Sequence, residues 1–192
     1  MKITGGLAKG IRLEVLPGDR TRPTTDRVRE SLFGSLAAFV PEAKVLDLFA
    51  GSGSLGLEAA SRGAESVTFV ESHSATVGQL KANTEKLKPA GVDCEMKVVT
   101  RKAEIFLREP SDAYDLVLID PPYSFFDDEG LIHSIWEKLS EPGWLSEEAL
   151  VVMEYPKRKQ PGCGEGWKVL KQKDYGGTQV AFVENVVRRF PS

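Results

Sequence analysis

The sequence predicts a doubly wound α/β fold with a mostly parallel sheet and an antiparallel C-terminal hairpin. From residue 44 onward, short apolar runs alternate with segments of helical spacing, which is typical of parallel strands joined by helical crossovers. The run 114–119 is almost entirely apolar, as expected for a strand buried on both faces. Near the end, two strand-like runs flank Asp174-Tyr175-Gly176-Gly177, which predicts the hairpin.

Size and composition fit one ordinary globular domain. The chain has 192 residues, of which 41% are hydrophobic and 28% charged, and this composition excludes disordered and coiled-coil classes. No apolar run approaches the roughly 20 residues of a membrane helix, and the start lacks the apolar segment of a secretory signal. Two cysteines are too few for a disulfide framework or a four-cysteine zinc site. We expect a soluble cytoplasmic protein, with a monomer as the default.

Residues 1–40 are predicted to form an N-terminal extension of a core at residues 41–192. The extension begins with a small hairpin of two short strands, 2–4 and 11–16, joined by a glycine-rich turn. A helix capped by a threonine at position 24 or 25 follows and is closed by Pro41. The apolar residues at helical spacing in it are Val28, Leu32, Leu36 and Phe39.

The core alternates strands with helices until the terminal hairpin. Its predicted strands are 45–49, 66–70, 95–99, 114–119, 150–154, 167–173 and 179–187. Its predicted helices are 55–62, 73–87, 103–108 and 130–139.

A glycine loop follows the first core strand and predicts a site for a nucleoside-containing cofactor. Gly51, Gly53 and Gly56 form a G-x-G-x-x-G pattern, and Glu71 lies 20 residues beyond the first glycine. Glycines let the backbone approach a ligand closely, and the following helix offers free N–H groups. An acid at the end of the second strand binds ribose hydroxyls.

Asp47, four residues before the loop, favours S-adenosylmethionine over a dinucleotide. A pyrophosphate is negatively charged, so a carboxylate near it is unfavourable, whereas S-adenosylmethionine carries an ammonium and a sulfonium. The alternative is that Asp47 only ties down the loop by accepting backbone N–H groups, and for Glu71 the alternative is an exposed helix cap.

A second motif, Asp120-Pro121-Pro122-Tyr123, follows the fourth core strand and so faces the same edge of the sheet as the glycine loop. The lone pair of an exocyclic amine on a nucleobase is delocalised into the ring. Two acceptors aimed at the amine hydrogens, the Asp120 carboxylate and the Pro121 carbonyl, favour a nitrogen that can react. The two prolines restrict the backbone and so pre-organise these acceptors. Tyr123 offers a face on which a base can stack.

Positive charge is concentrated at two places in a chain of net charge −3. Residues 1–31 carry a net +3 and residues 156–173 a net +5, whereas the segment between them carries −11. Local patches rather than net charge determine where nucleic acid binds. The alternative is two solvated faces without a partner.

These motifs together resemble the RsmD family, bacterial S-adenosylmethionine-dependent enzymes that methylate the exocyclic N2 of a guanine in 16S ribosomal RNA of the small ribosomal subunit. The resemblance rests on the loop 47–53, on Asp120–Tyr123, on the head 22–33 (Arg-Pro-Thr-Thr-Asp-Arg-Val-Arg-Glu-Ser-Leu-Phe) and on the tail 175–178 (Tyr-Gly-Gly-Thr). It spans about residues 1–184 and implies a Rossmann-like class I methyltransferase fold. The chain departs from the family at Gly34-Ser35, where Asn-Trp is usual, and at Arg101-Lys102, where an amide or acid usually precedes the alanine.

The resemblance implies a role for each matching residue. The cofactor S-adenosylmethionine would be held by Asp47, Phe49, Ala50, Gly51, Gly53, Glu71 and Ala103, the last of these near the adenine. The target base would be handled by Asp120, Pro121, Pro122 and Tyr123. Arg22, Thr24 and Arg27 are expected near the methionine end of the cofactor or an RNA phosphate, and the alternative for them is a helix start with solvated arginines. Contacts to the RNA, in the small subunit or an assembly intermediate, are also expected from Phe125, Lys157, Arg158 and Lys159. No metal is expected.

Several alternatives stay open. The same Asp-Pro-Pro-Tyr motif serves adenine N6 and cytosine N4 methylation in DNA, although this chain lacks a separate target-recognition domain. Methylation of a glutamine amide in a protein usually has Asn at the position of Asp120. An NAD-dependent oxidoreductase is disfavoured by Asp47 and by the lack of a recognisable hydride-transfer residue. A non-catalytic RNA-binding module is disfavoured by the two intact motifs.

Overall fold

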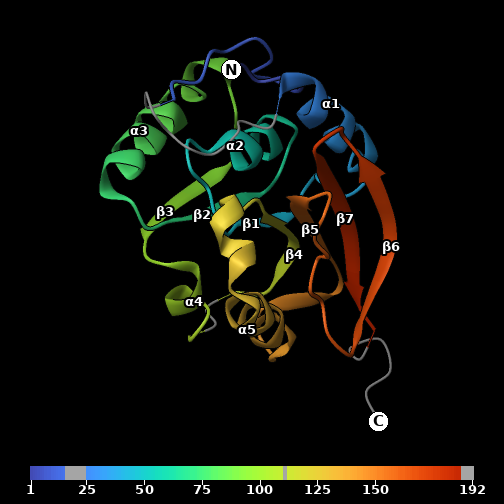
Figure 1. The fold of residues 1–192 in the computed structure, drawn as a ribbon. Coiled ribbons are helices and arrows are strands. Elements are labelled where there is room, and N and C mark those ends of the chain that lie inside the picture. Colours follow the sequence, from blue (N-terminus) through green and yellow to red (C-terminus); the bar gives the residue numbers. More distant parts are fainter. Residues whose placement is uncertain (16–24, 110–111, 187–192) are drawn as a thin grey trace.

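The computed structural model describes residues 1–15, 25–109 and 112–186, and one mixed sheet runs through them (Figure 1). The strand order is β3-β2-β1-β4-β5-β7-β6, and β7 runs antiparallel to both of its neighbours while the other pairs are parallel. The strands are β1 (Lys44–Asp47), β2 (Ser66–Glu71), β3 (Glu95–Thr100), β4 (Tyr114–Ile119), β5 (Leu145–Pro156), β6 (Trp167–Asp174) and β7 (Thr178–Asn185). The predicted parallel sheet with an antiparallel C-terminal hairpin is confirmed.

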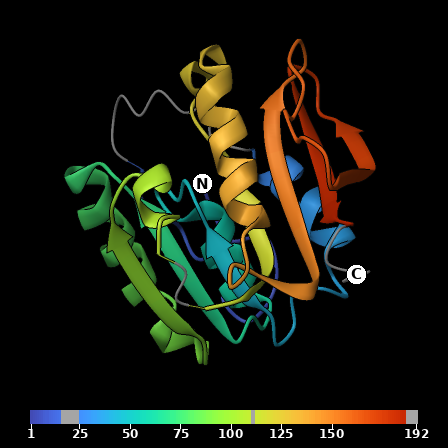
Figure 2. The ribbon, with the colours of Figure 1, turned by 90° about the horizontal axis from the view of Figure 1, so that it is seen from below.

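Helices cover both faces of the sheet (Figure 1). They are α1 (Asp26–Ser35), α2 (Ser54–Ser61), α3 (Ser74–Glu85), α4 (Ala103–Phe106) and α5 (Glu129–Ser140), with short 3₁₀ turns η1 (Lys88–Ala90) and η2 (Tyr123–Asp127). α1, α2 and α3 enclose one apolar core, and α4 and α5 enclose the other. Figure 2 shows α5 between α4 and the C-terminal hairpin. Two-sided cover explains why β4 is apolar along nearly its whole length.

The strand order reverses beside β1, and this reversal positions the functional site. β1 pairs with β2 on one side and with β4 on the other, so the chain leaves β1 toward one face and returns to β4 after crossing to the other. At such a switch point the loops after the two strands diverge and leave a crevice at the carboxyl ends. The glycine loop and the Asp120–Tyr123 loop are those two loops.

Most elements lie within a few residues of their predicted bounds, and three differ in an informative way. The N-terminal hairpin is reduced to one antiparallel bridge, Lys2 with Arg12, within residues 1–15. β5 begins at Leu145 rather than 150. The residues between Leu145 and Leu150 are mostly polar and lie at a register irregularity against β4, so they lack the apolar pattern by which a strand is predicted. Phe39 is 45% exposed. Its predicted place on the apolar face of α1 is wrong, because that helix ends at Ser35.

A buried carboxylate attaches the N-terminal segment and α1 to the core. Glu58 of α2 is fully buried and accepts hydrogen bonds from the Thr4 N–H at 2.8 Å and the Thr4 hydroxyl at 2.7 Å. It also pairs with two guanidinium groups, Arg29 at 3.2 Å and Arg62 at 2.8 Å. Arg29 is fully buried as well, so this carboxylate compensates a charge that has left water.

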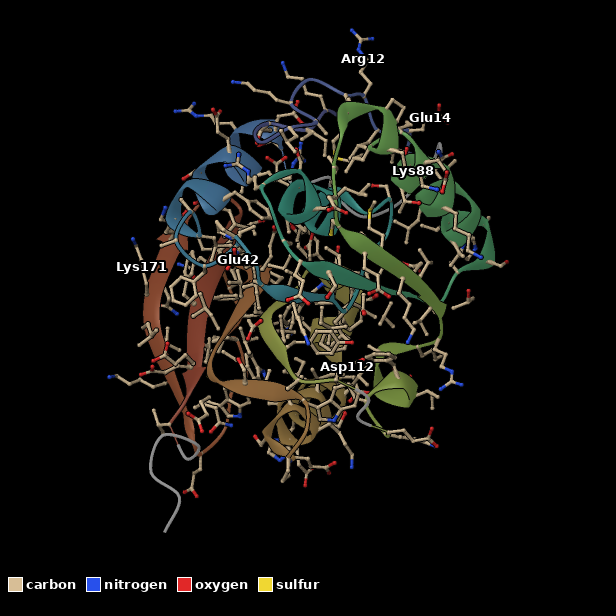
Figure 3. The ribbon with its side chains drawn as sticks, turned by 180° about the vertical axis from the view of Figure 1, so that it is seen from behind. Arg12, Glu14, Glu42, Lys88, Asp112 and Lys171 are labelled. Atoms are coloured by element: carbon tan, nitrogen blue, oxygen red, sulfur yellow. The ribbon has the colours of Figure 1, made fainter. Side chains whose placement is uncertain are left out.

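A second attachment runs through Asn83 of α3, which is also fully buried. Its amide accepts the Glu14 N–H at 3.0 Å and donates to the carbonyl oxygens of Glu14 at 2.9 Å and Ser52 at 3.0 Å. Figure 3 shows Glu14 beside α3. Because Ser52 belongs to the glycine loop, this one amide joins the N-terminal segment to that loop.

Replacing Glu58→Ala is expected to destabilise the protein by about 3–5 kcal/mol, because the buried Arg29 guanidinium keeps only its pair with the partly exposed Asp26 and the buried Thr4 groups lose their acceptor. The measurement is the free energy of unfolding in urea. The control is Glu85→Ala, whose pair with Lys88 is exposed (64% and 63%) and should change stability by less than about 1 kcal/mol. Equal effects of the two substitutions would contradict an anchoring role for Glu58.

Candidate active site

The glycine loop turns sharply from β1 into α2, and two of its glycines are required by close packing. Gly53 has φ +86°, and a Cβ there would lie 2.4 Å from the Leu80 side chain. A Cβ on Gly56 would lie 2.3 Å from the ring of Phe69 on β2. The spacing of the glycines therefore lets α2 pack directly on the sheet.

Asp47 ends β1 beneath this loop and is 1% exposed. Its carboxylate accepts the Gly56 N–H at 2.9 Å. Burial raises the pKa of Asp47 to about 7; the Gly56 hydrogen bond opposes that shift, and the negative charge of Glu71 adds to it. Of the two roles considered for Asp47, tying down the loop is the contact that the structure contains.

Glu71 ends β2 and is half-buried, with its carboxylate directed to the same loop. Its Oε2 accepts the Gly51 N–H at 2.9 Å, and its Oε1 accepts the N–H of His73, the residue before α3, at 2.8 Å. Glu71 thus sets the position of the glycine loop relative to α3, and it also forms part of a cleft wall.

A cleft of about 420 Å³, here called the main cleft, lies across the carboxyl ends of β1 to β4. Its lining consists of Leu48, Phe49, Val70, Glu71, Ser72, Arg101, Lys102, Ala103, Glu104, Pro122, Ser124, Phe125, Asp128 and Leu131. Five predicted site residues line it: Phe49, Glu71, Ala103, Pro122 and Phe125. The rings of Phe49 and Phe125 meet edge to face with centroids 5.1 Å apart, which joins the end of β1 to η2.

Other predicted residues lie around the main cleft rather than on its walls. Asp47, Ala50 and Gly53 are buried, and Gly51 is half-buried. The lining residues that sequence reasoning missed include Leu48, Val70, Ser72, Glu104, Ser124, Asp128 and Leu131. Asp128 carried a usable signal, since it is the N-cap of α5 and accepts the Leu131 N–H at 3.0 Å.

The Asp120–Tyr123 loop begins at the carboxyl end of β4, as predicted. Asp120 is half-buried and Pro121 is buried, whereas Pro122 and Tyr123 are exposed. Tyr123 presents 47% of its surface to solvent, although its hydroxyl hydrogen-bonds to the Thr178 hydroxyl at 3.0 Å. An exposed ring held at its far end is a suitable surface for stacking a flat ligand.

The turn between β6 and β7 connects this loop to α1. Thr178, 5% exposed, contacts Tyr123, and Tyr175 on the same turn hydrogen-bonds to Ser31 of α1 at 2.9 Å. The Lys173 ammonium also donates to Ser35. The Tyr-Gly-Gly-Thr segment of the tail therefore touches both the head motif and the Asp-Pro-Pro-Tyr motif, which sequence reasoning did not foresee.

The expected RNA-binding cations differ in how they are paired. Lys157 lies 2.5 Å from Asp174 and holds the pKa of that carboxyl below its usual value. Lys159 lies 3.5 Å from Asp127 and donates to the Phe126 carbonyl at 2.8 Å. Arg158 is exposed and has no carboxylate within 4 Å among the residues that the structure describes.

The head residues are only partly described. Arg27 is exposed near the start of α1, and the Thr25 hydroxyl caps this helix by accepting the Val28 N–H at 3.3 Å. Arg22 and Thr24 lie outside the described residues. Within residues 1–15, 25–109 and 112–186, no three His, Cys, Asp or Glu side chains gather as metal ligands. In the same part of the chain, no helix is long and apolar enough to cross a membrane.

The sheet order with its reversed β7, the glycine loop after β1, the acid ending β2 and the Asp-Pro-Pro-Tyr loop after β4 define a class I methyltransferase. A family model described as conserved hypothetical protein 95 matches residues 1–184. The chain belongs to this family, which confirms the RsmD family predicted from its motifs.

Named relatives and solved structures agree with this assignment. The chain is 37% identical to ribosomal RNA small subunit methyltransferase D of Haemophilus influenzae, over 96% of this chain and 94% of the relative. It is 38% identical to the protein of the same name from Escherichia coli K12, over 95% and 87%. The solved structure of E. coli yhhF superposes with a TM-score of 0.81 at 37% identity, covering 96% of this chain and 97% of that one.

Asp47 is expected to make stability depend on pH in a defined direction. Its pKa in the folded protein, about 7, lies above the ordinary value of 3.8, so folding favours the protonated form. The contribution is fully present below about pH 4 and is lost as pH rises through 7. The free energy of unfolding should fall by roughly 1 kcal/mol per pH unit in this window.

The measurement is urea unfolding at intervals between pH 4 and pH 7.5. Asp47→Asn keeps an acceptor for the Gly56 N–H but cannot ionise, so its curve should be flatter than that of the unsubstituted protein. Parallel curves for the two proteins would contradict the raised pKa.

Proposed function

We propose that this protein transfers a methyl group from S-adenosylmethionine to the exocyclic N2 of a guanine in 16S ribosomal RNA of the small subunit or its assembly intermediate. The observation that carries the proposal is the placement of the Asp120–Tyr123 loop at the edge of the main cleft, on the same sheet edge as the glycine loop and Glu71. A methyl donor in the cleft and a base beside Tyr123 would then meet at the end of β4.

The residues of the main cleft fit the proposed donor. Glu71 supplies a carboxylate for ribose hydroxyls, and Leu48, Val70 and Ala103 supply an apolar slot for a purine ring. The buried carboxyl of Asp47 and the N–H groups of the loop lie beneath. When bound, S-adenosylmethionine supplies a methyl group made electrophilic by its positively charged sulfur.

The target amine is activated by orientation. The Asp120 carboxylate and the Pro121 carbonyl accept the two amine hydrogens, which makes the nitrogen lone pair available to the methyl group. The proton released passes to Asp120 or to solvent. Tyr123 stacks on the base, and the base must leave its own stack in the RNA to reach it. Because the methyl group is already activated by its sulfonium, positioning contributes most of the acceleration.

The RNA substrate is supported by the names of the relatives, which act on small-subunit ribosomal RNA. The tail turn adds support from the structure, because it joins Tyr123 to the α1 segment that carries the head motif of the family. Identification of the methylated nucleoside distinguishes guanine N2 from adenine N6 or cytosine N4 as the target.

Small ribosomal subunits from cells lacking the endogenous activity should accept labelled methyl from S-adenosylmethionine, with N2-methylguanosine as the product. Asp120→Ala should lower turnover by roughly 10²- to 10³-fold, as loss of one pre-organised polar group does, while donor binding is kept. The control is Asp93→Ala, an exposed carboxylate in the loop before β3. Label on adenine or on protein would contradict the proposed substrate, and full turnover by Asp120→Ala would contradict the mechanism.

The Thr178–Tyr123 hydrogen bond is expected to position the stacking ring. Thr178→Val should lower kcat/KM for the RNA about three- to tenfold, the equivalent of one hydrogen bond, and leave the KM for the donor unchanged. Tyr123→Phe removes the same bond and keeps the ring, so the double variant should be no worse than either single variant. Additive losses in the double variant would show that the two hydroxyls act separately.

A further inference from the structure

A second cleft, here called the side cleft, lies at the carboxyl end of β5 and has a volume of about 550 Å³. It is bounded by the end of η2, the first turns of α5 and the segment that follows β5. Its walls include Phe126, Ile132, His133, Arg158, Lys159 and Gln160. This volume falls within the roughly 300–1,000 Å³ of small-molecule sites.

The side cleft is next to the main cleft along the same edge of the sheet. β5 is the parallel neighbour of β4, so their carboxyl ends lie together. Phe125 lines the main cleft, and the next residue, Phe126, lines the side cleft. The centroids of these two rings are 5.7 Å apart, so η2, which begins with Tyr123, forms the wall between the two clefts.

The rim of the side cleft is held in place by contacts to α5 and η2. The Trp136 indole N–H donates to the Pro161 carbonyl at 2.8 Å, and the Lys159 ammonium donates to the Phe126 carbonyl at 2.8 Å. A Cβ on Gly162 would lie 2.5 Å from Ile132, so the segment packs closely on the helix. The cleft is therefore formed before any ligand arrives.

The chemistry of the walls suits a nucleotide. Phe126 and Ile132 are buried side chains in the cleft lining, and they offer apolar contact for the ring of a nucleobase. His133 and Gln160 offer polar groups to the edge of a base, and the Glu129 carboxylate, also on the rim, accepts hydrogen bonds from amino groups. Arg158 completes the set as a guanidinium for a phosphate.

Arg158 differs from the two neighbouring lysines in its ion pairing. Lys157 is neutralised by Asp174, and Lys159 is committed to Asp127 and the Phe126 carbonyl. Arg158 is exposed on the cleft wall and has no carboxylate within 4 Å in the described part of the chain. An unpaired guanidinium can neutralise a phosphate, and so release counterions condensed on the RNA, without giving up a carboxylate partner.

We propose that the side cleft binds the nucleotide adjacent to the target base in the RNA strand, with Arg158 on its phosphate. The inference rests on the proposed function, because it assumes a single-stranded RNA segment whose target base lies against Tyr123. A strand continuing from that ring past η2 reaches the side cleft next. Asp120 and Pro121 act on the target amine alone. Recognition of a neighbouring nucleotide would therefore add selection for the RNA sequence or shape around the target base.

The charge test compares Arg158→Gln with Lys97→Gln, an exposed lysine on β3 at the opposite edge of the sheet. With small ribosomal subunits as substrate, Arg158→Gln should raise the KM for the particle roughly tenfold and reduce the slope of its salt dependence by about one. The kcat and the KM for S-adenosylmethionine should stay within about twofold. Lys97→Gln should match the unsubstituted protein. Equal effects of the two substitutions, or none from Arg158→Gln, would overturn the proposal.

The occupancy test fills the cleft. His133→Trp places a large ring on its wall, whereas Glu137→Trp places the same ring one turn further along α5, outside the lining. His133→Trp alone should raise the KM for the particle, and adding Arg158→Gln should raise it little further, because both act on one bound nucleotide. Additive effects, or equal effects of the two tryptophans, would overturn the proposal. Absence of methyl transfer to particles by the unsubstituted protein would instead refute the proposed function.

Discussion

The hydrogen bond from the Gly56 N–H to the buried Asp47 carboxylate fixes the point at which β1 becomes α2. Three further contacts of the site are made by residues of the loop that begins there. Gly51 reaches the Glu71 carboxylate, Ser52 offers its carbonyl to Asn83, and Phe49 meets Phe125 from the loop after β4. A carboxyl group removed from water and bonded to one N–H is costly unless protonated, which accounts for its raised pKa. The positive charge of a bound S-adenosylmethionine nearby would favour the ionised form of Asp47, so binding of this methyl donor and proton release at Asp47 are expected to be linked.

Two peripheral attachments connect substrate-facing parts of the chain to this core. Glu58 attaches the N-terminal segment and α1 to α2 through a buried hydrogen bond to Thr4 and a buried ion pair with Arg29. The β6–β7 turn reaches from Ser31 on α1 to Tyr123 after β4. The head and the reactive loop therefore share one rigid support, although about 90 residues separate them in the sequence. This arrangement gives the antiparallel hairpin a role beyond extending the sheet.

Local patterns made the parallel core predictable. β4 has its predicted bounds, since a strand buried on both faces leaves an uninterrupted apolar run. The glycine loop, Glu71 and the Asp120–Tyr123 loop were also predictable, because strand ends at one sheet edge follow from topology alone. The bond between Tyr123 and Thr178, the loss of Phe39 from the apolar face and the early start of β5 were not. Each depends on which distant segments pack together, and no spacing rule encodes that.

Charge counting shows the same limit for RNA binding. The net +5 of residues 156–173 predicts a basic patch, yet Lys157 and Lys168 lie close to carboxylates of Asp174 and Glu184 on the same hairpin. Lys173 is directed to Ser35 on α1. A paired cation gains less from a phosphate, because it must give up an existing partner. The effective cationic surface of this segment is therefore smaller than the sequence suggests, and it includes Arg158, which borders the side cleft. A protein of net charge −3 can then bind RNA through a few placed charges, and its selectivity follows from their geometry rather than their number.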